Sequence, residues 1–402
     1  MPIGITTGFK NSSGEDIGEK LVPKSYLIDR YPELVDTFRF SGLWMWGHNN
    51  YGGLGDNSVI HKSSPIQTIA GGTNWKTVSG SGYHTSAIKT DGTLWTWGHN
   101  NYGQLGDNTI DNKSSPVQTI AGGTNWKQVS SGWFHTSAIK TDGTLWMWGL
   151  NNNGQLGDNS VIRKSSPIQT VAGGTNWKTV SGSIYHTAAI KTDGTLWTWG
   201  RNNYGQLGDS TVANKSSTVQ TIAGGTNWKL VDCGAHHTSA IKTDGTLWLW
   251  GYNGYGQLGD STVASKSSPV QTVAGGTNWK LVAGGAYHTA AIKTDGTLWT
   301  WGRNNYGQLG DNTDANKSSP VQTIAGGTNW KLVAGGSYHT SAIKTDGTLW
   351  LWGYNGYGQL GDSTVANKSS TVQTIAGGTN WKLVDCGGYH TIAIRDDSDD
   401  YI

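Results

Sequence analysis

Seven histidines recur at a single spacing, and histidine is the side chain most often used to hold metals or move protons. Each stands before a threonine, once every 51 residues: His84, His135, His186, His237, His288, His339 and His390. Three histidines can hold zinc, but only if side chains from different repeats converge on one point. Seven equivalent copies favour a structural role, in which a ring nitrogen bonds a neighbouring strand or loop. The sequence therefore predicts no metal site and no cofactor.

Seven aspartates follow a Leu-Gly pair and raise the question of calcium. They are Asp56, Asp107, Asp158, Asp209, Asp260, Asp311 and Asp362. Calcium takes six to eight oxygen ligands, and each of these loops offers one carboxylate. A local turn, in which the carboxylate accepts a backbone N–H two residues on, is the favoured role. No Gly-x-Ser-x-Gly, phosphate-binding lysine loop or isolated carboxylate pair is present, so the sequence predicts that the protein is not an enzyme.

Tryptophans recur in Trp-x-Trp-Gly and in Gly-Gly-Thr-Asn-Trp-Lys, and together they account for 21 of the 22 in the chain. Aromatic pairs on a strand could stack on sugars or bases. Packing between structural units is the commoner fate of such residues, and we favour it. Only Trp133 lies outside the pattern.

Two positions differ between the copies, and a partner surface would use them. One follows Trp-Gly, and the other precedes the repeated histidine, where Tyr287, Tyr338 and Tyr389 complete the set. The candidate binding residues are His48, His99, Leu150, Arg201, Tyr252, Arg303 and Tyr354 at the first position, and Tyr83, Phe134, Tyr185 and His236 at the second. Neutral drift at exposed loops is the alternative explanation.

One period predicts four short strands, at 66–70, 75–80, 84–90 and 93–98 in the second copy. Asp91-Gly92 between the last two predicts a tight hairpin with a type I′ turn. The Gly- and Asn-rich stretch after Trp-Gly predicts a structured loop.

Stacking seven such units in a ring buries both faces of every unit, and the predicted fold is an all-β, seven-bladed β-propeller of four-stranded blades. The first copy, from Ser41, lacks the strand that should precede Trp-x-Trp. The last copy ends with the stretch 390–400 and lacks the Trp-x-Trp strand that should follow. Pairing of these N- and C-terminal strands would close the ring and leave no sheet edge at that point.

The stretch "HTSAIKTDGTLWTWGHNNYGQLG" resembles the repeat of the regulator of chromosome condensation family, and the likeness extends from residue 41 to about 396. It implies a seven-bladed propeller with shared termini. In that family the chromatin member is a guanine-nucleotide exchange factor that uses an inserted loop, which the uniform spacing here lacks. The plant ultraviolet receptor is similar in fold, but its Gly-Trp-Arg-His-Thr stretch is matched here only by "GWFHT" at 132–136. A bacterial member inhibits a β-lactamase through aromatic side chains on one face, which is the nearer model of use.

Composition and charge exclude several classes of function. The net charge is +2 and no basic run appears, so no specific nucleic-acid binding is predicted. Cys233 and Cys386 occupy one small-residue packing position and do not indicate a disulfide. No signal peptide or membrane span is visible, which predicts a cytoplasmic protein or a virion part.

We expect two regions, an N-terminal arm at 1–40 and the propeller at 41–402. The predicted function is a non-enzymatic ring that presents a rigid surface and is anchored through its arm to a protein or a larger assembly, such as a bacteriophage virion. A regulatory exchange or chromatin role and the binding of a cell-surface glycan are the alternatives.

Overall fold

The structure is a computed structural model that describes residues 41–69 and 74–396. The predicted arm at 1–40 and the last residues, 397–402, lie outside the described residues.

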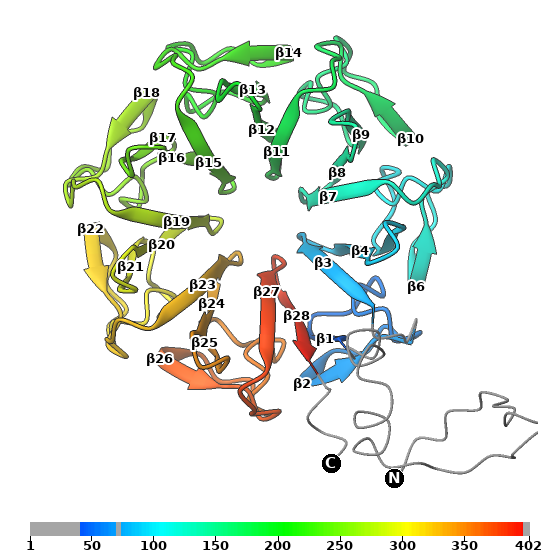
Figure 1. Cartoon of the computed structure of the whole chain (residues 1–402). Helices are drawn as coiled ribbons and strands as arrows, with labels where there is room; N and C mark the ends of the chain where they lie inside the picture. The colour runs from blue at the N-terminus through cyan, green and yellow to red at the C-terminus, as the bar shows by residue number, and fades with distance from the viewer. Residues whose placement is uncertain (1–40, 70–73, 397–402) are drawn as a thin grey trace, which may run out of the picture.

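Seven four-stranded antiparallel sheets stand around a central axis, and the predicted propeller is confirmed (Figure 1). The innermost strand of each blade begins at the tryptophan of the Asn-Trp-Lys motif. These strands are β3 (Trp75–Gly80), β7 (Trp126–Ser131), β11 (Trp177–Gly182), β15 (Trp228–Cys233), β19 (Trp279–Gly284), β23 (Trp330–Gly335) and β27 (Trp381–Cys386). The second strands begin at the repeated histidine: β4 (His84–Lys89), β8 (His135–Lys140), β12 (His186–Lys191), β16 (His237–Lys242), β20 (His288–Lys293), β24 (His339–Lys344) and β28 (His390–Asp396).

The third strands carry Trp-x-Trp-Gly, and the outermost strands carry Lys-Ser-Ser. The third strands are β1 (Ser41–Gly47), β5 (Leu94–Gly98), β9 (Leu145–Gly149), β13 (Leu196–Gly200), β17 (Leu247–Gly251), β21 (Leu298–Gly302) and β25 (Leu349–Gly353). The outermost strands are β2 (Lys62–Gln67), β6 (Lys113–Gln118), β10 (Lys164–Gln169), β14 (Lys215–Gln220), β18 (Lys266–Gln271), β22 (Lys317–Gln322) and β26 (Lys368–Gln373).

The outermost strand is where the sequence prediction was wrong. It spans 62–67 instead of 66–70, and it pairs with the preceding Trp-x-Trp strand, so it ends one blade instead of beginning the next. The residues of this strand are half-buried and mostly polar, so the sequence there shows no alternation of apolar and polar residues. Five of the seven outermost strands carry a proline, as at Pro65, and proline lacks the N–H that would extend a sheet at its edge.

The hairpin between the second and third strands exists, but its turn is not of the predicted type. Gly92 has a φ of 81°, whereas Asp91 does not have a positive φ, so a type I′ turn is excluded. Gly92 N–H donates to the Lys89 carbonyl (2.9 Å), which is the pattern of a type I turn followed by a left-handed glycine. A Cβ at Gly92 would lie 2.0 Å from the Thr124 carbonyl oxygen, so only glycine fits.

One blade is built from both ends of the described chain, as predicted. Its sheet order is β2-β1-β28-β27, and β1 pairs with β28 from Ser41↔Asp396 to Gly47↔His390. Figure 1 shows these strands, blue and red, side by side. The seventh blade therefore closes the ring.

The hydrophobic core is divided among the spaces between adjacent blades. At one such space Leu43, Met45 and Ile394 of the closing blade pack against Trp75 and Trp97 of the next. Trp97 has no exposed surface, and its indole N–H donates to the Gly53 carbonyl at 2.9 Å. The second tryptophan of each Trp-x-Trp pair and the tryptophan of each Asn-Trp-Lys motif are therefore buried packing residues. The first tryptophan of each pair is half-buried, as at Trp95, whose ring centroid lies 4.8 Å from Lys89 Nζ.

Candidate functional site

The two variable positions meet at one end of the ring. Each third strand ends at Trp-Gly where each second strand begins at histidine, because Gly98 pairs with His84. The residue after Trp-Gly and the residue before the histidine therefore lie together at that end. His99 and Tyr83 show this, with ring centroids 6.2 Å apart.

Contacts between rings connect these residues around the axis. Tyr83 faces Phe134 at 6.4 Å on one side and Tyr389 at 6.1 Å on the other. On the far side Tyr287 stacks on Tyr338 at 6.0 Å. We call this set the aromatic collar: His48, Tyr51, Tyr83, His99, Tyr102, Trp133, Phe134, Leu150, Tyr185, Arg201, Tyr204, His236, Tyr252, Tyr255, Tyr287, Arg303, Tyr306, Tyr338, Tyr354, Tyr357 and Tyr389.

All eleven candidate binding residues lie in the collar, but they differ in exposure. His48, His99 and Leu150 are buried, with 6–7% of their surface exposed. The other eight are half-buried. Burial and the neighbouring His61 lower the pKa of His48 to about 4, so this part of the collar is uncharged at neutral pH.

Six tyrosines of the collar come from a position that the sequence analysis did not select. They are the tyrosines of the Asn-x-Tyr-Gly loop: Tyr51, Tyr102, Tyr204, Tyr255, Tyr306 and Tyr357. The third repeat has Asn153 there and Leu150 beside it, so the loop after Trp-Gly adds no aromatic ring to the collar at that blade. A search for differences between repeats passes over a residue that six of them share, although a tyrosine that is not fully buried in a loop is itself a sign of a contact surface.

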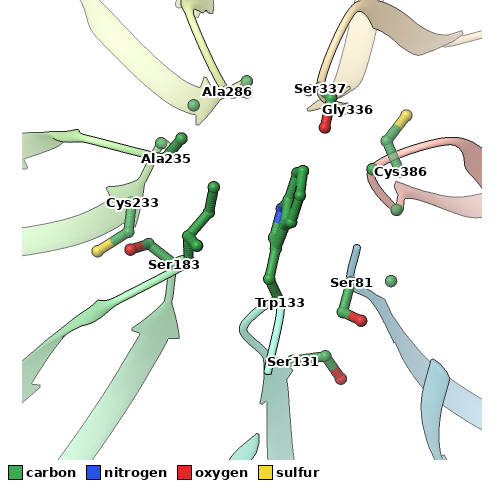
Figure 2. A pocket seen from close by; sticks show the side chains of 18 of the residues that line it. Ser81, Ser131, Trp133, Ser183, Cys233, Ala235, Ala286, Gly336, Ser337 and Cys386 are labelled. Atoms are coloured by element: carbon green, nitrogen blue, oxygen red, sulfur yellow. The ribbon is translucent and has the colours of Figure 1, made fainter. Parts of the chain in front are cut away.

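Trp133 stands on the axis inside the collar. Figure 2 shows it at the centre of the opening, with Ser81, Ala235, Ala286 and Ser337 around it. Its ring packs on Tyr83 at 5.8 Å and on Tyr389 at 6.3 Å. A cavity of about 70 Å³ remains beside it. The tryptophan that departs from the repeat therefore narrows the axial channel at the collar end.

Directly beneath the collar, the repeated histidines form a closed set of contacts that we call the histidine band. His84 Nε2 lies 2.8 Å from Thr136 Oγ1 of the next blade, and the same contact recurs around the ring until His390 Nε2 meets Thr85 Oγ1 at 3.1 Å. Each threonine hydroxyl also donates to a loop carbonyl, as Thr85 does to Gly53 at 2.9 Å, so the histidine Nε2 must be the donor in each pair. The predicted structural role is confirmed.

Burial keeps the histidine band uncharged. It lowers the pKa of His135, His237, His339 and His390 to about 3 and that of His288 to about 4. Uncharged histidines of this kind fit the structural contacts that they make. The band joins each blade to the next.

Two aspartates line the axial channel below the band. Asp232 and Asp385 stand where other blades have Ser79, Ser130 or an alanine, beside a cavity of about 290 Å³. Asp385 accepts the Gly80 N–H of the next blade at 2.9 Å. Burial nevertheless raises its pKa to about 7, and the charge of Asp232 adds to that shift.

The Leu-Gly-Asp aspartates make the predicted local turn. Asp56 Oδ1 accepts the Ser58 N–H at 3.1 Å, and Asp56 Oδ2 lies 3.4 Å from Lys62 Nζ. Across 41–69 and 74–396, no three His, Cys, Asp or Glu side chains gather closely enough to hold a metal ion. The same residues include no helix long and apolar enough to cross a membrane. Cys233 and Cys386 are buried free thiols at their small-residue position.

This architecture defines a class, the closed β-propeller of tandem repeats. The profile of the RCC1-like domain matches residues 41–280, and that of the regulator of chromosome condensation (RCC1) repeat matches 295–343 and 346–394. The ultraviolet-B receptor UVR8 of Arabidopsis thaliana is 32% identical over 330 residues, which cover 79% of this chain and 74% of the receptor. The chain belongs to the RCC1-repeat family.

Other relatives and solved structures agree with that assignment. The regulator of chromosome condensation of Xenopus laevis is 27% identical over 85% of this chain and 86% of its own. The human E3 ubiquitin-protein ligase HERC2 is 30% identical over 87% of this chain, which spans only 8% of that much longer protein. Human WBSCR16 and the yeast RCC1 Prp20 have the same fold, with TM-scores of 0.78 and 0.79 at 20% and 19% identity. They cover 89% and 90% of this chain, and the matches take in 99% and 90% of those chains.

Proposed function

We propose that the protein is a non-enzymatic, regulatory protein-binding propeller that presents the aromatic collar to its partner. The observation that carries this proposal is the collar itself: half-buried tyrosines, histidines and arginines in mutual contact at one end of the ring. Tyrosine and arginine are enriched at protein interfaces, because they supply large contact areas and fixed hydrogen-bond donors. The collar is also where the repeats differ, and a partner could tell one arc of it from another.

The relatives support a protein partner. Solved structures of the yeast RCC1 are described as bound to Kap60 and by their binding to Gsp1p and histones. A regulatory role of this kind suits the present chain better than a scaffold does. Exchange-factor activity has no dedicated element here, because the uniform repeat spacing leaves no inserted loop.

Two other interpretations stay predictions from the sequence. Anchoring to a virion depends on residues 1–40, which lie outside the described residues, and the relatives named above come from plants, animals and yeast. Glycan binding by the collar would rest on tyrosine stacking alone.

Photo-crosslinking tests the proposal. A benzoylphenylalanine at Tyr252 or Tyr338, both in the collar, should capture a discrete protein from an extract of the source cells. The same group at Lys127, exposed at the opposite end of β7, is the control. Equal capture from the two ends would contradict the proposal. If the protein binds specific glycans on an array and Tyr338→Ala abolishes that binding, the partner of the collar is a sugar and not a protein.

A further inference from the structure

One arginine of the collar is surrounded by aromatic rings. The Arg303 guanidinium carbon lies 5.2 Å and 5.7 Å from the ring centroids of Tyr255 and Tyr287, and 5.6 Å and 5.1 Å from those of Tyr306 and Tyr338. Its backbone N–H donates to the Tyr287 carbonyl at 2.9 Å, which fixes the start of the side chain. Four rings around one guanidinium hold it in place without a counter-charge.

The hydrogen-bonding capacity of Arg303 is largely unused. Its Nε is buried and has no hydrogen-bond partner. Among residues 41–69 and 74–396, the ion pairs join a lysine to an aspartate, and the aspartate of the same repeat, Asp311, pairs with Lys317 at 3.5 Å. A guanidinium that uses its faces for aromatic contacts keeps its in-plane N–H donors for another ligand.

The surroundings of Arg303 favour a ligand with a single negative charge. Arg201, the other collar arginine, lies over Tyr185 and Tyr204 and shares no ring with Arg303. A phosphate dianion at Arg303 would therefore meet one cation only, whereas a carboxylate would be neutralised and would match the fork of the guanidinium.

We propose that Arg303 receives a carboxylate of the bound protein, an Asp or Glu side chain or a chain terminus, between the rings of Tyr255 and Tyr338. This inference rests on the proposed function, since it names the chemistry of the partner at the same collar. It assigns Arg303 as the residue that sets specificity. The remaining collar residues supply contact area.

Peptide selection on the whole chain tests this assignment. A random peptide library displayed on phage is panned against the wild-type protein, and enriched peptides are synthesised with a fluorophore for polarisation measurements of Kd. Enriched sequences should share an Asp, a Glu or a free C-terminus. Arg303→Gln should weaken their binding about tenfold or more, and Arg303→Lys, which keeps the charge but loses the fork, should weaken it less.

Controls separate the carboxylate from other effects. Arg163→Gln removes the same charge from an exposed loop outside the collar, where Arg163 Nη1 donates to the Asn101 carbonyl, and should change Kd less than about twofold. Replacing the acidic residue of the peptide by its amide should cost the wild type the same factor as Arg303→Gln, and should cost the Arg303→Gln variant nothing further. Unchanged melting temperatures establish that each variant is folded.

The outcomes also distinguish this inference from the proposed function. Peptides without a carboxylate, or Kd values that Arg303→Gln leaves within about twofold, overturn the assignment of Arg303. If Tyr338→Ala still abolishes their binding, the collar remains the binding face. Peptides that no collar variant weakens, or a library that yields none, contradict the proposed function itself. If a phosphoserine peptide binds more tightly than the same peptide with glutamate, the ligand of Arg303 is a phosphate and not a carboxylate.

Discussion

The histidine band and the aromatic collar are built from neighbouring residues but follow opposite rules. Tyr83 lies in the collar and His84, the next residue, lies in the band. All seven blades repeat the band, whereas the collar position before it holds tyrosine, phenylalanine or histidine. The band joins each blade to the next, so a change there opens the contact between two blades. Most collar residues are half-exposed, as Tyr83 is, and can change without disturbing that contact. The residues that hold the ring closed, in the histidine band, are therefore different from the collar residues that we propose bind a partner.

Acid should produce the largest difference between band and collar, because it acts on the whole band together. The folded-state pKa values of about 3 to 4 lie below the ordinary 6.5, so below pH 6.5 the unfolded chain binds more protons than the ring. Stability is then lost as pH falls, by up to about 1.4 kcal/mol per pH unit for each histidine. We expect the melting temperature to fall steeply between pH 6.5 and 5, by calorimetry. A flat profile over that range would contradict the buried, neutral band.

Truncating one tryptophan between the blades should have the next largest effect. Trp301 is fully buried, and its indole N–H donates to the Gln257 carbonyl at 2.8 Å. Trp301→Ala should lower the free energy of unfolding by about 3–5 kcal/mol. Trp133→Ala in the collar is the matched control and should cost clearly less, because Trp133 is only half-buried. If both variants lose the same free energy of unfolding in urea denaturation, the space between the blades and the collar do not differ in their contribution to stability.

Replacing a channel aspartate should stabilise the ring at high pH. The pKa of Asp385 is raised to about 7 from an unfolded value near 3.8, so its contribution to stability falls as pH rises from about 4 to about 7. Asp385→Ser reproduces the neighbouring blade, where Ser79 Oγ accepts the Ser131 N–H at 2.9 Å. We expect a gain of about 1–2 kcal/mol at pH 8 and a smaller one at pH 5. Asp314→Ser, in an exposed loop, is the control; a gain of the same size there would assign the effect to net charge.

The smallest change in stability is expected at the collar. Tyr338→Ala should alter the free energy of unfolding by no more than about 1 kcal/mol, because the ring is half-exposed and takes no part in the histidine–threonine contacts that join the blades. The same variant should lose partner capture in the crosslinking assay. A large loss of stability would mean that collar and band are not separable.

Repetition made most of the fold predictable. Each Trp-x-Trp strand and each His-Thr strand lies where its period-two pattern places it, and the incomplete copies at Ser41 and Asp396 predicted the closing blade. The outermost strand was misplaced, since a half-buried Lys-Ser-Ser-Pro segment lacks an apolar alternation. The turn at Gly92 was assigned the wrong type, because Lys89 N–H donates to the Thr93 carbonyl and leaves three residues in the loop, whereas a type I′ hairpin has two.

The site was only partly predictable. Variation between copies identified Arg303 and Tyr83, but it says nothing of which positions approach each other across blades. The four rings around Arg303 come from loops of three consecutive blades, which only the packing of blade against blade brings together. The place of Trp133 on the axis depends in the same way on the whole assembly.

The closing blade also determines when its strands can pair during biosynthesis. Among the strands that the structure describes, β1 and β2 are made first, whereas the strand that pairs with β1, β28 at His390–Asp396, is made last. Until then β1 has an open edge, and the first and last blades lack a neighbour. A chain stalled before residue 390 would expose unpaired strand edges that invite pairing with other nascent chains. Protection by chaperones would matter most in that interval.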